Sequence, residues 1–331
     1  MRLPGTLAEQ PAAPRIAVVI PCFRVTRHVA GVIAAIGPEC ERIYVVDDAC
    51  PDHSGDFVAA NCRDERVRIL RHSTNQGVGG AVMTGYRAAL DDGATVIVKI
   101  DGDGQMDPRL LRRFVAPIVA GEADYTKGNR FYDLGDVGRM PWVRIFGNAV
   151  LSVLAKLSTG YWGIFDPTNG YTAIHARLVQ HLPLARISTR YFFETDILFR
   201  LNTLRAVVVD IPMRAVYADE TSNLQVSRIV FEFLGKHVRN FGKRLFYNYF
   251  LRDMSIASIE LVLGSLLLGF GVVFGAYHWL LSAEQDVAAP LGTIMLSALS
   301  VLTGLQLVLA FLSYDIAAVP RRAIHDLLPE R

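Results

Sequence analysis

Short runs of β-branched and apolar residues recur through the first part of the chain, and patterns typical of helices separate them. The runs occupy residues 15–20, 42–47, 67–71 and 95–100. Between and after them, residues 77–90 predict one helix and residues 108–120 another, with Asp107 placed to cap its start and Pro108 in its first turn. Continuous apolar strands that alternate with helices are typical of an α/β domain whose mostly parallel sheet is covered on both faces.

Two much longer apolar runs lie further along, at residues 256–281 and 288–314. Glu260 is the single charge in the first run, and the second run has none. Since about 20 apolar residues cross the hydrocarbon core of a bilayer, each run is long enough to form a transmembrane helix. Two buried helices of a soluble protein are the alternative, but such helices alternate polar and apolar faces, and these runs do not.

The charges around these runs predict how such a hairpin is oriented. The connection at 282–287 carries Glu284 and Asp286 but no basic residue, whereas basic residues flank the outer end of each run. Basic residues favour the cytoplasmic side of a membrane. We therefore expect the N-terminal domain and a tail at 315–331 to lie on the cytoplasmic side.

The stretch 226–253 has the pattern of an amphipathic helix, with apolar residues on one side of a helical wheel and charged residues on the other. The apolar side consists of Val230, Leu234, Val238, Phe241 and Leu245. The charged side consists of Arg228, Glu232, Lys236, Arg239 and Lys243. A basic amphipathic stretch beside a membrane span predicts interfacial helices in the headgroup layer. Packing against the soluble domain is the alternative.

The composition narrows the class of protein. With 331 residues, 51% of them hydrophobic and 20% charged, the chain is too apolar to be disordered. Its net charge of +2 gives no basic field, so we expect no nucleic-acid partner. The four cysteines form no C-x-x-C pair. Residues 1–14 lack the apolar core of a signal peptide and predict a disordered lead before a domain at 15–225.

Polar clusters follow the predicted strands, which is where ligands bind in open α/β sheets. The strand at 95–100 runs into Asp101 and Asp103, two carboxylates at i and i+2, and then Gln105. Like charges held close together are costly unless a cation neutralises them, and oxygen ligands suit Mg²⁺ or Mn²⁺. We interpret this cluster as a metal site, with a solvated Asp-Gly turn as the alternative. Neither a Rossmann G-x-G-x-x-G after the first strand nor a P-loop motif is present.

Six motifs occur in order between about residues 15 and 224: VVIPCF, VVDDACPDHSGD, NQGVGGA, KIDGDGQMDP, KGNRF and DPTNGY. Together they resemble the family 2 (GT-A fold) glycosyltransferases, and most of all the polyprenyl-phosphate glycosyltransferases of the dolichol-phosphate mannose synthase type. The two apolar runs fit the membrane-anchored bacterial members. The resemblance implies a GT-A nucleotide-sugar-binding domain, followed by interfacial helices and a two-helix transmembrane hairpin.

The resemblance also implies which residues contact the nucleotide and the metal. It assigns a nucleotide pocket to Pro21, Cys22, Phe23, Asp48, Gly77, Gly79 and Asp101. In this pocket Asp48 would lie near the base or ribose, and the glycines would let the backbone approach the nucleotide. Asp101 would lie near the ribose and the metal, while Asp103 and Gln105 would hold Mg²⁺ or Mn²⁺ against the diphosphate.

Further residues match positions close to the transferred sugar and the acceptor. Arg130 matches an arginine that faces phosphate, and Asp166 an acidic residue near the donor sugar; with Asp103 they form the implied catalytic set. A surface arginine and a helix cap or turn before Pro167 are the respective alternatives. Residues 218–224 match a mobile loop over the site, with Asp219 and Ser222 as candidate loop residues.

Glu194 is a candidate acceptor-side group, in the stretch YFFETDILFR. An ordinary helix start is the alternative, because acidic residues in the first turn of a helix favour its dipole.

The implied reaction is an inverting, metal-dependent transfer of a sugar from a nucleoside-diphosphate sugar to a polyprenyl phosphate such as undecaprenyl phosphate, for an envelope glycan or glycolipid. We expect a UDP-sugar first and GDP-mannose second. The family further implies a bacterial inner membrane, with the catalytic domain on the cytoplasmic face, and a homo-oligomer such as a tetramer.

Two rival functions remain open at this point. A lipid or polysaccharide hydroxyl as acceptor would need a base, for which Asp166 and Glu194 are the candidates. A non-catalytic membrane scaffold that kept the fold is the other rival, and the intact Asp101, Asp103 and Arg130 argue against it.

Overall fold

The computed structural model describes residues 13–132, 142–214 and 226–329. The protein divides into two units, each of which packs mainly against itself. We call residues 1–152, 164–226 and 321–331 the sheet unit, and residues 153–163 and 227–320 the helical unit.

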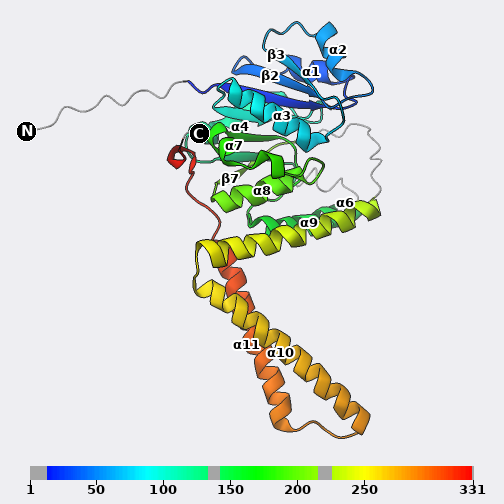
Figure 1. The fold of residues 1–331 in the computed structure, drawn as a ribbon, viewed down its shortest axis with the longest axis vertical. Helices are drawn as coiled ribbons and strands as arrows, with labels where there is room; N and C mark the ends of the chain where they lie inside the picture. The colour runs from blue at the N-terminus through cyan, green and yellow to red at the C-terminus, as the bar shows by residue number, and fades with distance from the viewer. Residues whose placement is uncertain (1–12, 133–141, 215–225, 330–331) are drawn as a thin grey trace, which may run out of the picture. The chain divides into compact units, whose positions relative to one another are not determined.

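A single sheet organises the sheet unit (Figure 1). Its strands are β1 (Ile16–Cys22), β2 (Cys40–Asp47), β3 (Val67–Arg71), β4 (Val96–Lys99), β5 (Tyr125–Asn129), β6 (Thr172–His175) and β7 (Val208–Pro212), in the order β3-β2-β1-β4-β6-β5-β7. All neighbours are parallel except β6, which is antiparallel to both β4 and β5. The prediction of an α/β domain with a mostly parallel sheet is confirmed, and the reversed strand β6 is an addition to it.

Helices connect these strands and cover the sheet. They are α1 (Val29–Ala34), α2 (Ser54–Asn61), α3 (Val78–Asp91), α4 (Leu111–Val119), α7 (Ala176–His181) and α8 (Phe193–Leu204), with α6 (Trp142–Thr159) shared between the units. Short 3₁₀ helices lie at Pro108–Leu110, Leu184–Arg186 and His325–Leu327. Asp107 caps the first of these, since its carboxylate accepts from the amide of Arg109 at 3.0 Å.

The core of the sheet unit is apolar on both faces of the central strands. Val18, Val45 and Val98, from β1, β2 and β4, are fully buried. On the α4 side, Phe114 stacks on Tyr171 with ring centroids 3.9 Å apart. This burial explains why the strand runs are continuously apolar, because a strand covered on both faces has no solvent side for polar residues.

The tail after the last long helix is part of the sheet unit. Asp124, at the start of β5 and fully buried, accepts hydrogen bonds from the amides of Ile324 and His325 and faces the His325 ring at 2.7 Å. The His325 ring stacks on His175 with centroids 4.2 Å apart. The sequence indicated a tail here but not that it docks on the sheet.

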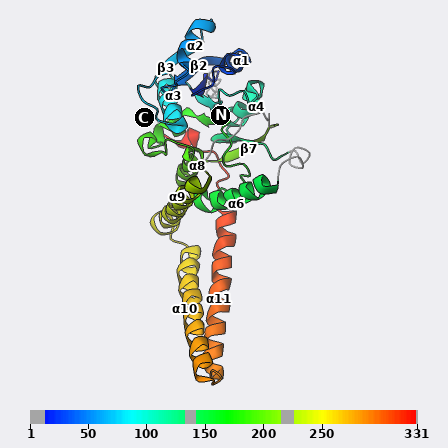
Figure 2. The same cartoon turned by 90° about the vertical axis from the view of Figure 1, so that its right-hand side faces the viewer.

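The helical unit is built from the end of α6, α9 (Val226–Phe246), a π-helical turn (Tyr247–Arg252), α10 (Ile256–Gln285) and α11 (Leu291–Ala317). Helices α10 and α11 lie side by side along their length (Figure 2). Both are long enough and apolar enough to cross a membrane. Gly264, Gly271 and Gly304 let the two backbones approach closely, because a side chain at any of them would meet the partner helix.

The ends of these helices differ from the boundaries predicted from the sequence. Helix α10 continues to Gln285, so Glu284 is helical rather than part of the connection. Helix α11 continues to Ala317, so Asp315 belongs to the helix and not to the tail.

Asp315 is 4% exposed and pairs with Arg244 of α9, which is 1% exposed, through N–O contacts of 2.6 and 3.0 Å. The hydroxyl of Tyr249 and the indole of Trp162 also donate to Asp315, at 2.6 and 2.9 Å. This buried pair therefore has partners for both carboxylate oxygens.

Candidate functional site

One edge of the sheet collects most of the residues singled out from the sequence. The carboxyl ends of β1, β2, β4 and β5 carry Phe23, Asp48, Asp101 and Arg130 respectively, either as the next residue or two residues on. Because β6 is antiparallel, the loop before it reaches the same edge, and that loop contains Asp166. Strand direction alone therefore brings these groups to one side of the sheet unit.

Asp48 holds the glycine-rich loop that follows β3. It is 3% exposed, and its carboxylate accepts from the amides of Gln76 and Gly77 at 2.8 and 2.7 Å and faces the His72 ring at 2.7 Å. Both carboxylate oxygens are thus engaged inside the protein. The carboxylate of Asp48 thus fixes this loop, and its place near the base or ribose stays a prediction.

Gly77 and Gly79 are required by the protein's own packing. Gly77 has φ of 86°, a conformation that favours glycine, and a Cβ there would lie 2.6 Å from the carbonyl oxygen of Thr189. A Cβ at Gly79 would lie 2.5 Å from the carbonyl oxygen of Ser188. In the described residues, the group that comes close to both glycines is the segment before α8, and their approach to a nucleotide stays a prediction.

The three residues at the end of β1 differ in what they present. Cys22 is 1% exposed and belongs to the hydrophobic core, where burial raises the pKa of its thiol. Pro21 is also buried within the strand. Phe23 is 43% exposed, so among the three it offers a side chain on which a base could stack.

The aspartate after β4 is held by a buried lysine. Lys99 is 1% exposed, and its ammonium lies 2.7 Å from Asp101 and 3.7 Å from Glu194. Burial alone would lower the pKa of Lys99, but these two carboxylates raise it. Glu194, in the first turn of α8, is itself buried, and burial raises its pKa to about 7. Glu194 therefore lies beside Lys99 as a buried counter-ion.

Asp103 and Gln105 form a compact turn, in which Asp103 accepts from the amide of Gln105 at 2.9 Å. No group of three or more acidic, histidine or cysteine side chains suited to a metal occurs within the ranges the structure describes. Magnesium, however, is commonly bound through one or two carboxylates together with substrate phosphates. The donor set of Asp103, Gln105 and Asp101 fits a metal of that kind, which a diphosphate would complete.

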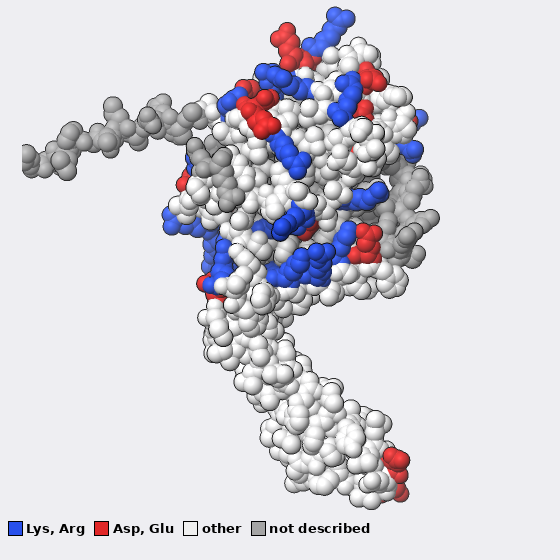
Figure 3. All heavy atoms as spheres, in the orientation of Figure 1, with Lys and Arg blue, Asp and Glu red and all other residues white. Residues whose placement is uncertain are grey.

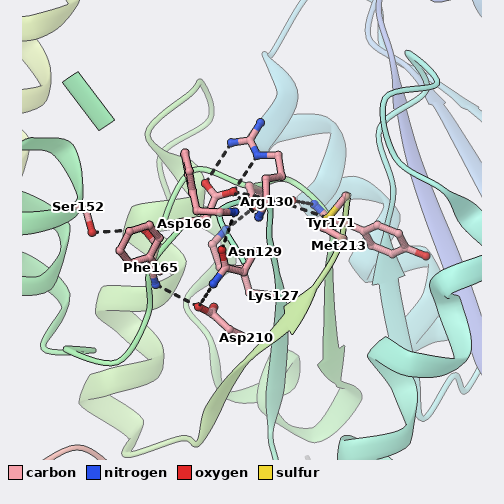
Figure 4. A network of polar contacts seen from close by, with 11 residues as sticks. Lys127, Asn129, Arg130, Ser152, Phe165, Asp166, Tyr171, Asp210 and Met213 are labelled. Carbon is pink, nitrogen blue, oxygen red and sulfur yellow. Dashed lines mark hydrogen bonds and ion pairs between the residues drawn. The ribbon is translucent and has the colours of Figure 1, made fainter. Parts of the chain in front are cut away.

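Arg130 and Asp166 form an ion pair at the same edge (Figure 4). The guanidinium of Arg130 donates to both carboxylate oxygens of Asp166, at 2.7 and 3.0 Å. Asp166 is 1% exposed, whereas the Arg130 side chain is 30% exposed. This geometry leaves the cation at the surface of the site with its counter-charge behind it, which is an arrangement suited to an anionic ligand.

A second buried lysine supports this pair from below. The ammonium of Lys127, in β5, donates to the carbonyl oxygen of Asn169, whose side-chain amide donates to Asp166 at 3.2 Å. Burial lowers the pKa of Lys127 to about 8, although Asp166 and Glu194 act in the opposite direction. Lysines rarely occur fully buried unless paired. A lysine inside each of the runs TVIVKI and YTKGN was therefore the sequence signal by which Lys99 and Lys127 could have been found.

The predicted loop over the site, at 218–224 with Asp219 and Ser222, lies outside the described residues. The roles inferred for all of the site residues remain predictions, including those for Asp103, Arg130 and Asp166.

Comparison with known proteins shows the family to which the chain belongs. The family model of "Glycosyl transferase family 2" matches residues 17–182. The chain belongs to glycosyl transferase family 2. It is thus a glycosyltransferase, and the family assignment made from the motifs is confirmed.

Two relatives in the family are named for lipid-linked reactions. Polyprenol monophosphomannose synthase of Mycolicibacterium smegmatis is 27% identical over 226 residues, covering 64% of this chain and 84% of the relative. Undecaprenyl-phosphate mannosyltransferase of Micrococcus luteus is 32% identical over 181 residues, covering 54% of this chain and 73% of the relative.

Solved structures show the same GT-A-like fold. Mannosyl-3-phosphoglycerate synthase of Rubrobacter xylanophilus superposes with a TM-score of 0.53 at 19% identity, over 73% of this chain and 77% of that one. Glucosyl-3-phosphoglycerate synthase of Mycobacterium tuberculosis, in complex with Mn²⁺, UDP and phosphoglyceric acid, gives 0.50 at 17% identity, over 73% and 81%. At these identities the likeness concerns the fold.

Proposed function

We propose that this family 2 glycosyltransferase transfers a sugar from a nucleoside-diphosphate sugar to a polyprenyl phosphate, with undecaprenyl phosphate as the probe of choice. The observation that carries the proposal is that one chain combines the glycosyltransferase site with two long helices whose surfaces are apolar. An enzyme with a soluble acceptor has no need of such helices, whereas a lipid acceptor stays in the bilayer. The two polyprenyl-phosphate relatives support the same acceptor class.

A divalent metal, Mg²⁺ or Mn²⁺, is part of this proposal. Asp103 and Gln105 would hold it, with Asp101 close by and fixed by Lys99 at 2.7 Å. When bound, the metal neutralises the charge that grows on the leaving diphosphate. The Mn²⁺ and UDP in the glucosyl-3-phosphoglycerate synthase complex agree with this, and with a UDP-sugar as first candidate donor and GDP-mannose as second.

A lipid phosphate needs positioning more than it needs a base. Its second pKa lies near ~6, so at neutral pH it is largely a dianion. Arg130 is a partly exposed cation of the site and would face phosphate, with Asp166 orienting its guanidinium. Attack by the phosphate oxygen on the face opposite the leaving diphosphate would invert the anomeric carbon.

The rival acceptor, a lipid or polysaccharide hydroxyl, fits this geometry less well. Such an acceptor needs a base to remove its proton. Asp166 is 1% exposed and has both oxygens on Arg130, and Glu194 is buried beside Lys99. Both carboxylates thus face charged groups inside the protein and do not lie at the surface where an acceptor hydroxyl would arrive.

Exposed apolar side chains support a position at the membrane surface. On α9, Phe231 and Val238 are 77% and 63% exposed, while the polar His237 and Asn240 are buried. This helix therefore exposes apolar side chains, as an interfacial helix would. We propose that α9 lies in the headgroup layer, that α10 and α11 span a bacterial inner membrane, and that the sheet unit is cytoplasmic, as the basic flanks predict.

The deciding experiment offers labelled UDP-sugars and GDP-mannose to membranes that contain the full chain and undecaprenyl phosphate. We expect one donor to give a lipid product that contains phosphorus and is cleaved by mild acid. Asp103→Ala should abolish the transfer and the binding of Mn²⁺ in the presence of UDP, measured by electron paramagnetic resonance. Asp107→Ala is the matched control, since it removes a helix cap and a pair with the exposed Arg109 but no proposed metal ligand.

Two results would reject the proposal. A phosphorus-free lipid product that survives mild acid would identify a hydroxyl acceptor. Full transfer by Asp103→Ala, with Mn²⁺ binding unchanged, would remove the metal assignment.

A further inference from the structure

Two oppositely charged residues lie at paired positions of neighbouring strands, under the turn that carries Asp166. In the parallel pairing of β5 with β7, Lys127 is in register with Asp210. Neither residue was a candidate from the sequence. Both lie next to the Arg130–Asp166 pair (Figure 4).

Asp210 joins the two segments that carry the ion pair. One of its oxygens, Oδ2, accepts from the side-chain amide of Asn129 at 3.1 Å and from the backbone amide of Phe165 at 3.0 Å. Asn129 immediately precedes Arg130, and Phe165 immediately precedes Asp166. A single carboxylate oxygen therefore fixes the residue before each member of the pair.

Lys127 holds the other end of the same turn. Its ammonium donates to the carbonyl oxygen of Asn169, and the side chain of Asn169 donates to Asp166. The turn from Phe165 to Asn169 is thus fastened at its start by Asp210 and at its end by Lys127. Ion pairs and hydrogen bonds at both ends of a short segment restrict the positions that its carboxylate can take.

We propose that Asp210 is a positioning residue of the transferase, which, with Lys127, fixes the turn bearing Asp166 so that Arg130 is aimed at the phosphate of the ligand. This inference rests on the proposed function only for the identity of that phosphate. Asp210 acts through Asn129 and Phe165 and does not touch the reacting atoms.

The electrostatics indicate that this carboxylate is kept charged at a cost to stability. Burial raises the pKa of Asp210 to about 6, with Asp166 acting in the same direction and Lys127 in the opposite one. Its second oxygen, Oδ1, has no hydrogen-bond partner among the described residues. A carboxyl group whose pKa is raised on folding opposes folding at pH values above the folded pKa. Asp210 is therefore better explained by its effect on the site than by a contribution to stability.

The test compares Asp210→Asn with wild type in the full chain. Loss of the charge weakens two hydrogen bonds to a carboxylate, so we expect kcat to fall roughly tenfold to hundredfold. The KM for the donor should change little, because the nucleotide groups are untouched. The melting temperature at pH 8 should equal or exceed that of wild type. In an Arg130→Ala background, Asp210→Asn should cost much less, since its effect passes through Arg130.

Asp124→Asn is the matched control, because Asp124 is also a buried carboxylate that accepts backbone amides, here those of Ile324 and His325. We expect this variant to lower the melting temperature and to keep near-normal kcat in the molecules that remain folded. If Asp210→Asn behaves like Asp124→Asn, or if its effect adds fully to that of Arg130→Ala, the positioning role is wrong.

A readout without substrate separates this inference from the proposed function. Hydrogen exchange of a peptide covering residues 160–170 reports on the amide of Phe165. We expect faster exchange there in Asp210→Asn than in wild type, with peptides of β1 to β4 unchanged. Unchanged exchange at 160–170 would overturn the inference even if transfer fell. Faster exchange would support it even if undecaprenyl phosphate proved to be the wrong acceptor.

Discussion

The sheet unit and the helical unit place their apolar side chains in opposite ways. In the sheet unit, valines and isoleucines fill the centre of the sheet, and most charged side chains lie outside (Figure 3). In the helical unit, Arg244 and Asp315 are buried, while α10 and α11 expose leucines and valines along their length. Figure 3 shows almost no charged atoms along these two helices except at the end where they connect.

On the proposal that α10 and α11 span a membrane, the two units meet different solvents. Burying apolar surface stabilises a domain in water. In hydrocarbon that force is absent, so apolar side chains face outward and polar groups must find partners inside. The Arg244–Asp315 pair, with Tyr249 and Trp162 on the same carboxylate, satisfies that requirement.

Breaking the buried Arg244–Asp315 pair should lower the free energy of unfolding most. Arg244→Met leaves Asp315 charged and unpaired, which costs about 3–5 kcal/mol. Arg15→Met is the control, since Arg15 pairs with Glu41 through an equally two-pronged contact but both side chains are about half exposed. We expect little or no change from the control, because exposed pairs contribute little. Chemical unfolding of the full chain in detergent micelles measures both, and equal effects would contradict the comparison.

The same leucine-to-alanine substitution should change the free energy of unfolding differently in the two units. Leu201→Ala in α8 removes a fully buried side chain and should cost about 2–5 kcal/mol of unfolding free energy. Leu266→Ala in α10 changes a side chain that is 65% exposed and should leave unfolding in micelles nearly unchanged. A large loss from Leu266→Ala would show that α10 has a protein partner on that side instead of lipid.

A smaller change in stability should depend on pH and arise in the sheet unit. Burial lowers the pKa of His175 to about 4, with help from His325 and Arg177, whereas the unfolded value is near 6.5. The unfolded state therefore binds more protons between these values, so stability is full above pH 6.5 and falls as the pH drops towards 4. Melting temperatures of His175→Gln should fall less over that interval. A parallel decline in both proteins would assign it to other groups.

Much of the fold follows from sequence because its signals are local. The apolar runs predicted β1 to β4, and the long runs at the end predicted α10 and α11. Strands β5, β6 and β7 were not predicted, since runs such as YTKGN and TAIH contain polar residues that only the tertiary structure buries. Helix α6 was not predicted either. Two large apolar side chains on it, Trp142 and Phe146, are 83% and 71% exposed.

The candidate site was predictable where a motif carries it and not where distant segments meet. Asp101, Asp103 and Arg130 could be named from sequence because each lies in a short motif after a strand. The partners of these residues could not be named from sequence. Lys99 contacts Glu194, almost a hundred positions away in the chain, and Asp210 contacts Asn129, which lies 81 positions before it. Pairings of that kind depend on strand order, which no local pattern encodes.

The docked tail has a consequence for how the protein is made. The carboxylate of Asp124 accepts a hydrogen bond from the amide of His325, which is 201 positions later in the chain. During synthesis, β5 therefore leaves the ribosome long before its last hydrogen-bond partners exist, and both long helices are made in between. Contacts that far apart form late in folding. The hydrogen bonds of Asp124 are thus complete only after Ile324 and His325 have been made and have returned to the sheet.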